Sequence, residues 1–339
     1  MIYLEGSKLR FDFRSVHPSA RCDITFQRTL RIPDDNREYP LPPGLGEFPL
    51  FHLEDYAAKV PKHWSVRGGV FFPMYQSEAM WLYFSGRYPV AIKIAAGKIN
   101  AVSGEPWRDE LSGSPQDYAV VPGQPWLDGF CVEKGLIRQF VAMPLGGGFT
   151  AEEQLTGKAE FGGIQLCVYP MKRDFYERWQ ESLKQLPSEN YDCSCYDADA
   201  PRFMRSRRVE EPSMGLAPGG LMRQEIFEDE HGLDAWDTSA MARCFVHLVN
   251  SEQFHSITAQ APPQPPATAK DYTQAGLPWF DYYDHDRKAL AGAAPLAGLD
   301  SLAAKMIKVG KKILPGNEPV TPKRVVVMEA KGKVSDGRW

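Results

Sequence analysis

The stretch VAIKIAAGKINAV, residues 90–102, is the part of this chain that decides the fold most clearly. Ile92 and Ile94 alternate with smaller or polar residues, and this period of two is typical of an extended strand. Gly97 then supplies the positive φ that a tight turn requires, and Ile99 begins a second apolar run. The stretch therefore predicts a β-hairpin.

Strand patterns of the same kind recur on both sides of this hairpin. They fall at residues 21–32, 118–121, 136–143, 164–169, 221–227 and 243–249, whereas helical patterns are few and fall at 52–60, 173–186 and 301–314. Aromatic and β-branched residues in the extended runs favour a sheet. We therefore predict a mainly β protein of the α+β type, a β-sandwich or open barrel with a few peripheral helices.

A proline-rich connector, APPQPPATA at residues 261–269, interrupts the chain after the last of these strands. Such a composition favours an extended polyproline segment. We therefore predict a β-rich globular domain over residues 1–258 and a C-terminal arm over residues 259–339. The arm carries an aromatic segment and a basic amphipathic helix.

The charge of the chain is mildly negative, at −4, which argues against nucleic-acid binding as its main role. Residues 302–339 hold nine basic and three acidic residues, so this part carries about +6 and the remainder about −10. The longest apolar runs, such as 79–84, fall far short of the roughly 20 residues of a transmembrane helix. Charges near the N-terminus stand where a signal peptide is apolar, so we expect a cytoplasmic protein.

The six cysteines predict no metal centre. Most lie in apolar or alternating segments, as small core residues do. Only Cys193 and Cys195 lie close together, and one C-x-C pair supplies too few ligands for a tetrahedral zinc site. Cys131 as a catalytic nucleophile is an alternative, but it needs a nearby base and a lowered pKa.

Three further segments are distinctive: RTLRIPDDNREYPLPPGLGEFPL (28–50), VPGQPWLDG (121–129) with RQFVAMPLGGGFTAEEQLTG (138–157), and GLPWFDYYD (276–284). In these segments the chain resembles a family of uncharacterised microbial proteins, and the likeness spans most of its length. The resemblance implies a shared fold. It assigns no activity, cofactor or site residue.

The segment PLGGGFTAEEQ, residues 144–154, is a candidate ligand-binding turn. Gly146, Gly147 and Gly148 precede Thr150, which has capping-box spacing to Glu153. A glycine-rich turn that enters a helix presents free backbone amides, which can hold a phosphate or a carboxylate. No lysine follows as in a P-loop, so an ordinary helix cap is the simpler interpretation.

A metal site is a second candidate. His247, His255 and His285, with Asp284 beside the last, supply the ligand types of a catalytic zinc or a facial iron triad. Metal-binding spacings such as HExxH are absent from the sequence. A core role for His247 and a surface role for His285 are the alternatives.

The aromatic segment LPWFDYYDHD, residues 277–286, is a candidate interface. Aromatic side chains make good anchors in protein contacts, and these four are Trp279, Phe280, Tyr282 and Tyr283. A proline linker followed by such an anchor can reach a second subunit. The alternative is that the arm folds back and places these rings in its own domain.

The leading hypothesis is therefore a non-catalytic binding or scaffold protein, which contacts a protein partner or a second copy through its C-terminal arm. The alternative is a metal-dependent enzyme with a His/carboxylate site in the mouth of the β domain. A third idea is that the basic helix docks on an anionic membrane or an acidic partner. The sequence identifies no cofactor.

Overall fold

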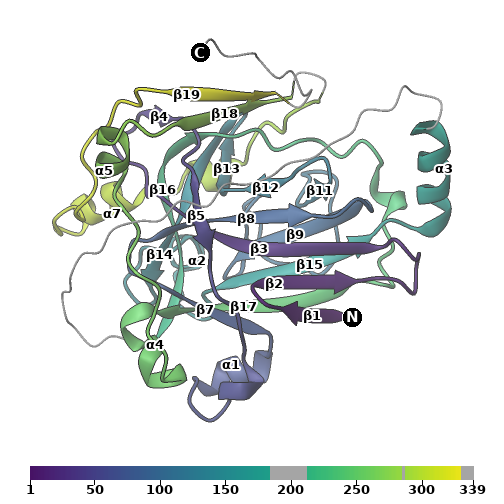
Figure 1. The fold of residues 1–339 in the computed structure, drawn as a ribbon, viewed down its shortest axis with the longest axis horizontal. Helices are drawn as coiled ribbons and strands as arrows, with labels where there is room; N and C mark the ends of the chain where they lie inside the picture. The colour runs from purple at the N-terminus through teal and green to yellow at the C-terminus, as the bar shows by residue number, and fades with distance from the viewer. Residues whose placement is uncertain (184–211, 285–286, 330–339) are drawn as a thin grey trace.

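Antiparallel strands dominate the fold, as seen in a computed structural model that describes residues 1–183, 212–284 and 287–329 (Figure 1). The strands of the main sheet are β1 (Ile2–Glu5), β2 (Lys8–Asp12), β3 (Arg21–Thr29), β4 (Glu38–Tyr39), β5 (Gly44–Glu47), β6 (Phe51–His52), β7 (Val70–Met74), β8 (Ala79–Ser85), β9 (Val90–Ala96), β10 (Ile99–Asn100), β11 (Ala119–Val121), β12 (Trp126–Leu127), β13 (Gly129–Glu133), β14 (Leu136–Pro144), β15 (Ile164–Pro170), β16 (Ser213–Arg223) and β17 (Ala242–Asn250). The predicted mainly β class is confirmed.

The strands form two facing layers. In one layer the neighbours run β1-β2-β3-β8-β14-β16, and in the other they run β7-β17-β15-β9-β11. The start of β16 also pairs with the end of β17, through Ser213↔Val249 and Met214↔Leu248, so the layers join at this corner. The result is a mainly antiparallel sandwich with few helices around it (Figure 1).

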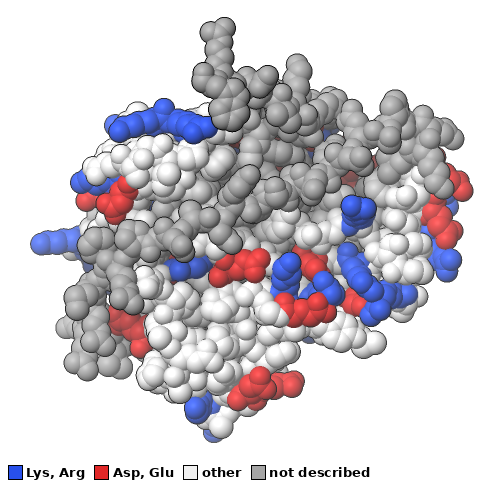
Figure 2. Space-filling view, viewed as in Figure 1, with Lys and Arg blue, Asp and Glu red and all other residues white. Residues whose placement is uncertain are grey.

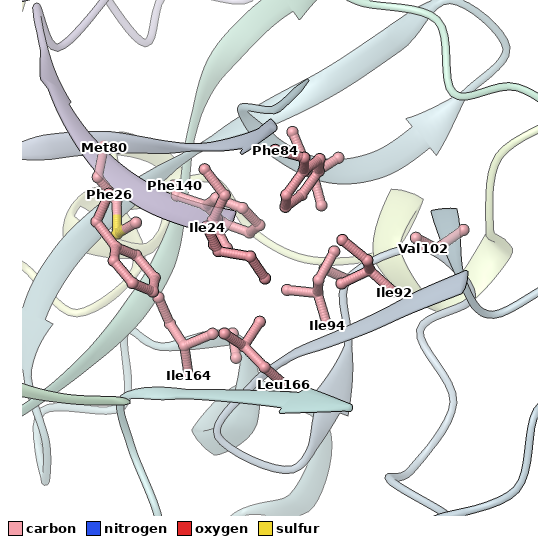
Figure 3. Packing of buried hydrophobic residues seen from close by; sticks show 14 of the residues in the cluster. Ile24, Phe26, Met80, Phe84, Ile92, Ile94, Val102, Phe140, Ile164 and Leu166 are labelled. Carbon is pink, nitrogen blue, oxygen red and sulfur yellow. The ribbon is translucent and has the colours of Figure 1, made fainter. Parts of the chain in front are cut away.

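The space between the layers is filled by apolar side chains from alternate strand positions. Figure 3 shows side chains of β3, β8 and β14 pointing toward those of β9 and β15. Each of these side chains is almost completely buried: Ile24, Phe26, Met80, Phe84, Phe140, Ile92, Ile94, Ile164 and Leu166. Burial of this kind stabilises a fold by about 1.5–3 kcal/mol for each large apolar side chain.

The hairpin that the sequence predicted is present. Strand β9 pairs with β10 through Ile99↔Ala96, and Gly97 adopts φ +59° at the turn between them. A side chain at this position would also collide with Glu152, because a Cβ on Gly97 would lie 2.3 Å from its Oε2 atom. Both the turn and the close approach therefore require glycine.

The helices are short and lie at the periphery: α1 (Lys62–Arg67), α2 (Ala151–Thr156), α3 (Arg173–Leu183), α4 (Ser251–Thr258), α5 (Ala269–Gln274), α6 (Ala294–Ala297) and α7 (Leu302–Lys308). The helix predicted at 173–186 is confirmed as far as Leu183, and its last three residues lie outside the described part. The helix predicted at 52–60 is wrong. Only a single 3-10 turn, Glu54–Tyr56, forms there.

The predicted C-terminal helix is shorter than expected, because it ends at Lys308 rather than continuing to residue 314. Gly310 adopts a left-handed φ of +69°. Its N–H donates to the carbonyl of Ile307, and the N–H of Lys311 donates to the carbonyl of Met306. These two bonds form a Schellman motif, which satisfies the last carbonyls and stops the helix.

Strand β16 begins eight residues before the predicted start at Leu221, and it ends at Arg223 rather than at residue 227. The early part, SMGLAPGG, contains residues that normally interrupt strands. The register between β14 and β16 shifts between Arg138 and Phe140 of β14. This irregularity accommodates Pro218, which lies opposite Phe140. The sheet therefore tolerates a proline at an irregular position in the β14–β16 pair.

The C-terminal arm folds back onto the β-rich body. Within the arm, β18 (Trp279–Tyr283) and β19 (Val325–Glu329) form a separate two-stranded parallel sheet, which the sequence did not predict (Figure 1). Leu302 and Met306 of α7 pack in an apolar cluster with Val141 and Phe149 of the body. The arm is therefore attached to the body at both the aromatic strand and the basic helix.

Candidate functional site

The aromatic segment predicted as an interface is anchored in its own chain through strand β18. The backbone of Phe280 exchanges two hydrogen bonds with Leu41, with N···O distances of 2.7 and 2.9 Å. Trp279 is fully buried, and its ring lies near those of Tyr39 and Tyr272. Its indole N–H has no hydrogen-bond partner among the described residues. Trp279 is thus a core residue rather than an exposed anchor.

A half-buried ion pair and a ring contact hold the other end of β18. Arg223 donates to both carboxylate oxygens of Asp281, each at 2.8 Å. The rings of Tyr282 and Trp126 meet edge to face, with their centroids 4.8 Å apart. The side chain of Tyr283 lies outside the described part. A bidentate Arg–carboxylate pair fixes orientation as well as distance, so β18 is firmly positioned on the body.

Exposed aliphatic side chains concentrate in the C-terminal arm. Of the eleven large apolar side chains that are exposed among the described residues, six lie in the arm. The described part of the arm is less than a quarter of the described chain. The six are Leu277, Ile307, Val309, Ile313, Val325 and Val327. Isolated exposed apolar residues are normal, whereas their accumulation marks interaction surfaces.

Three of the six belong to a segment that we call the basic-apolar segment, residues 307–313 (IKVGKKI). Ile307 is 63 % exposed, and Val309 and Ile313 are also exposed. The three lysines between them are exposed as well; Lys308 pairs with Asp300, and Lys311 lies 5.0 Å from the ring of Phe149. Figure 2 shows several basic side chains at the upper left, in the region of α7, β18 and β19, with acidic side chains beside them.

Two small pockets border the arm. One lies under Tyr282, between Leu41, Trp126 and Gln224, and the other lies between α7 and the strand residues Gly219 and Gly220. Each has a volume of about 10 Å³, which is the space of a single water position. In this conformation both pockets admit water rather than an organic ligand.

A buried carboxyl group, which the sequence analysis missed, lies beside the pocket under Tyr282. Asp128 is only 4 % exposed. Its Oδ2 atom accepts a hydrogen bond of 2.7 Å from Gln224, and its backbone N–H donates to the same amide at 3.0 Å. Burial raises the pKa of Asp128 from 3.8 to about 7, although the side chains of Gln224 and Trp126 partly oppose the rise. Asp128 is therefore a titratable group close to neutral pH.

The glycine-rich turn at 144–154 binds a carboxylate of its own chain. The backbone N–H groups of Gly146 and Gly148 donate to Oε1 of Glu153, at 2.8 and 2.9 Å. The N–H and hydroxyl of Thr150 donate to Oε2, at 3.1 and 2.8 Å. Thr150 and Glu153 also form the predicted capping box at the start of α2. Three of the residues predicted to bind an external anion, Gly146, Gly148 and Thr150, thus donate to Glu153.

The preceding glutamate has a comparable structural role. Oε2 of Glu152 accepts hydrogen bonds from the backbone N–H groups of Gly162 and Phe161, at 2.8 and 3.3 Å. Burial raises the pKa of Glu152, and these two hydrogen bonds oppose the rise. Glu152 thereby ties α2 to the segment that leads into β15.

The predicted metal ligands lie in different surroundings. His247 is buried, stacks on Trp64 with a centroid distance of 4.7 Å, and lies 3.0 Å from the carbonyl of Gly68. Burial lowers its pKa to about 4, so it is neutral at physiological pH. His255 is exposed on α4, with Nδ1 3.2 Å from the carbonyl of Gln260.

Asp284 pairs with Arg287, with 3.3 Å between Oδ2 and Nε. His285 lies outside the described residues, so its place relative to the other predicted ligands is not part of the structure. Across residues 1–183, 212–284 and 287–329, no group of three or more His, Cys, Asp and Glu side chains is arranged to share a metal ion. The metal-site hypothesis therefore stays a prediction.

The four described cysteines are buried thiols. Burial raises the pKa of Cys131 and of Cys244 to about 12, and that of Cys167 to about 11. A thiol with so high a pKa is protonated at neutral pH, whereas a nucleophile needs the thiolate. Cys193 and Cys195 lie outside the described part.

Buried ion pairs were also missed by the sequence analysis. Glu78 accepts from Arg28 at 2.8 Å, and Lys93 lies 2.6 Å from Asp117. Burial raises the pKa of Glu78. These partners are far apart in sequence, and each lies in or beside a strand whose pattern resembles that of its neighbours. No local signal therefore distinguished them from solvated charges.

No helix in the described part of the chain combines the length and the apolar character that crossing a bilayer requires. A comparison of the chain with models of known protein families, with curated proteins and with solved structures finds no significant match.

Proposed function

We propose that this protein acts by binding rather than by catalysis, and that its C-terminal arm is the contact surface for a protein partner or for a second copy. The observation that carries the proposal is the concentration of exposed aliphatic side chains in the arm. Leaving such groups in water is unfavourable, and burying one of them in a contact stabilises it by about 1.5–3 kcal/mol.

The basic-apolar segment indicates the chemistry of the partner. Three exposed lysines alternate with Ile307, Val309 and Ile313. A surface of this kind fits an apolar patch that is rimmed by carboxylates, because opposite charges steer the encounter and fix the register. The remainder of this chain is itself acidic, so a second copy has the matching charge.

Site-specific photo-crosslinking tests the proposal. A photoreactive residue replaces Ile307 in one variant and Val66 in the control, because Val66 is 87 % exposed on α1, outside the arm. In cells that produce the protein, we expect a covalent adduct from position 307 and a much weaker one from position 66. The double change Lys311→Glu with Lys312→Glu should lower the adduct yield from position 307 several-fold. Equal yields from both positions, or insensitivity to the charge reversal, would contradict the proposal.

A further inference from the structure

Strand β19 has one hydrogen-bonding edge that faces away from its partner. Trp279 donates its N–H to the carbonyl of Arg324 at 2.9 Å, and the register places Trp279 opposite Val325 and Asp281 opposite Val327. In a parallel ladder, alternate residues bond to the neighbouring strand. Arg324, Val326 and Met328 therefore face β18, whereas Val325 and Val327 direct their N–H and C=O groups outward.

The outer edge of β19 has the features of a strand-pairing site. Within the described residues β19 pairs only with β18, whose own far side pairs with Leu41. Val325 is 40 % exposed and Val327 is 56 % exposed. Natural sheets usually protect an edge with proline, lysine or a bulge, yet the sequence of β19 is VVVME. A two-stranded sheet is also marginal by itself.

We propose that β19 pairs antiparallel with β19 of a second copy of this chain, about a two-fold axis at Val327. The inference rests on the proposed function, because it names the partner and the contact within the arm. Outward N–H and C=O groups select an extended strand, since neither a lipid surface nor a helix supplies a matching ladder.

The sequence of the strand is self-complementary in this arrangement. Val327 lies opposite its own copy, and Val325 lies opposite Glu329 of the second copy. In a parallel arrangement of two copies, by contrast, Lys323 and Arg324 of one copy would lie beside the same two residues of the other. Charge therefore favours the antiparallel direction.

The predicted contact is modest in strength. Pairing through the outward backbone groups of residues 325, 327 and 329 of each strand forms about six backbone hydrogen bonds, and each contributes only modestly to stability. The buried area is below that of a standard interface, which is typical of weak and transient association. We therefore expect a dimer whose dissociation constant is of micromolar order.

The experiment measures the mass of the full-length protein by light scattering over a concentration series, together with amide hydrogen exchange at residues 325 and 327. We expect dimerisation and concentration-dependent protection of these two amides. Val327→Pro removes an outward N–H without breaking a bond to β18, and Val327→Lys places a charge on the edge. Each variant should raise the dissociation constant at least tenfold, while Val66→Lys should not change it. Far-UV circular dichroism checks that all variants fold.

A monomer at every concentration would overturn the inference, and so would protected amides in a monomer, because another segment would then cover the edge. An unchanged dissociation constant in both Val327 variants would overturn it as well. The photo-crosslinking from position 307 separates the two proposals. If the chain is monomeric and still gives a partner adduct from position 307, only the dimer inference fails; if it gives neither, both fail.

Discussion

Replacing Asp128 by asparagine should stabilise the protein above neutral pH and change its stability little in acid. The carboxyl is buried, and burial raises its pKa from 3.8 to about 7. Between these values the folded chain keeps a proton that the unfolded chain loses. The stability that this protonated carboxyl contributes is therefore fully present below about pH 4. It is lost as the pH rises through about 7, because over this range the folded state binds more protons than the unfolded state does.

The magnitude follows from the two pKa values. A rise from 3.8 to about 7 corresponds to about 4 kcal/mol of lost stability once the group is fully ionised. Between pH 4.5 and pH 8, about 3 kcal/mol of that loss should appear in the natural protein. Asparagine cannot ionise and still offers an oxygen to Gln224, so the variant should lack this part of the pH dependence.

Urea unfolding followed by tryptophan fluorescence at pH 4.5 and pH 8 measures the effect. The control is Asp234→Asn, which removes an exposed carboxyl and should shift stability by less than about 0.5 kcal/mol at either pH. If Asp128→Asn destabilises the protein equally at both pH values, the carboxyl is ionised in the folded state, and the reasoning from burial is refuted.

Two further predictions concern groups that the sequence offered as site residues. Glu153→Ala should lower the free energy of unfolding by about 2–4 kcal/mol, because it leaves the donors of the 144–154 turn without their carboxylate. In the same urea assay the control Glu230→Ala, which changes an exposed residue, should be nearly neutral. A loss of less than about 0.5 kcal/mol from Glu153→Ala would contradict the assigned role. Cys131 should react with a thiol reagent at pH 7 only as fast as the protein unfolds, because burial raises its pKa to about 12. Peptide mass spectrometry measures this labelling. Rapid labelling of Cys131 in the folded protein would restore it as a candidate nucleophile.

Features set by short-range pattern could be predicted from the sequence, because alternation of side chains directly reflects the geometry of a strand. Ile92, Ile94 and Gly97 specify a hairpin without knowledge of the rest of the chain. Gly310 carried a similar local signal, since a glycine near a helix end favours the left-handed stop that ends α7. Giving that signal its weight would have predicted the correct end of the helix.

Features set by long-range burial could not be predicted in this way. Asp128 becomes titratable near neutral pH because Gln224, almost a hundred residues later, closes over it. Pro218 is tolerated in β16 because the opposite strand shifts register at the same level. The donors of the glycine-rich turn were predicted from sequence, whereas the identity of their acceptor depended on how the side chain of Glu153 folds back.

The arrangement of the arm explains why the same segment is both buried and exposed. Trp279 and the Arg223–Asp281 pair fix β18 on the body, and β18 in turn orients β19. A partner strand that adds to β19 therefore meets an edge that is already ordered, so binding does not include the entropic cost of folding the arm. Weakening the anchor, for example by Trp279→Ala, should therefore raise the dissociation constant of the proposed dimer, although Trp279 touches no partner. In the proposed dimer the aromatic residues support the contact surface, and the aliphatic edge of β19 beyond them makes the contact.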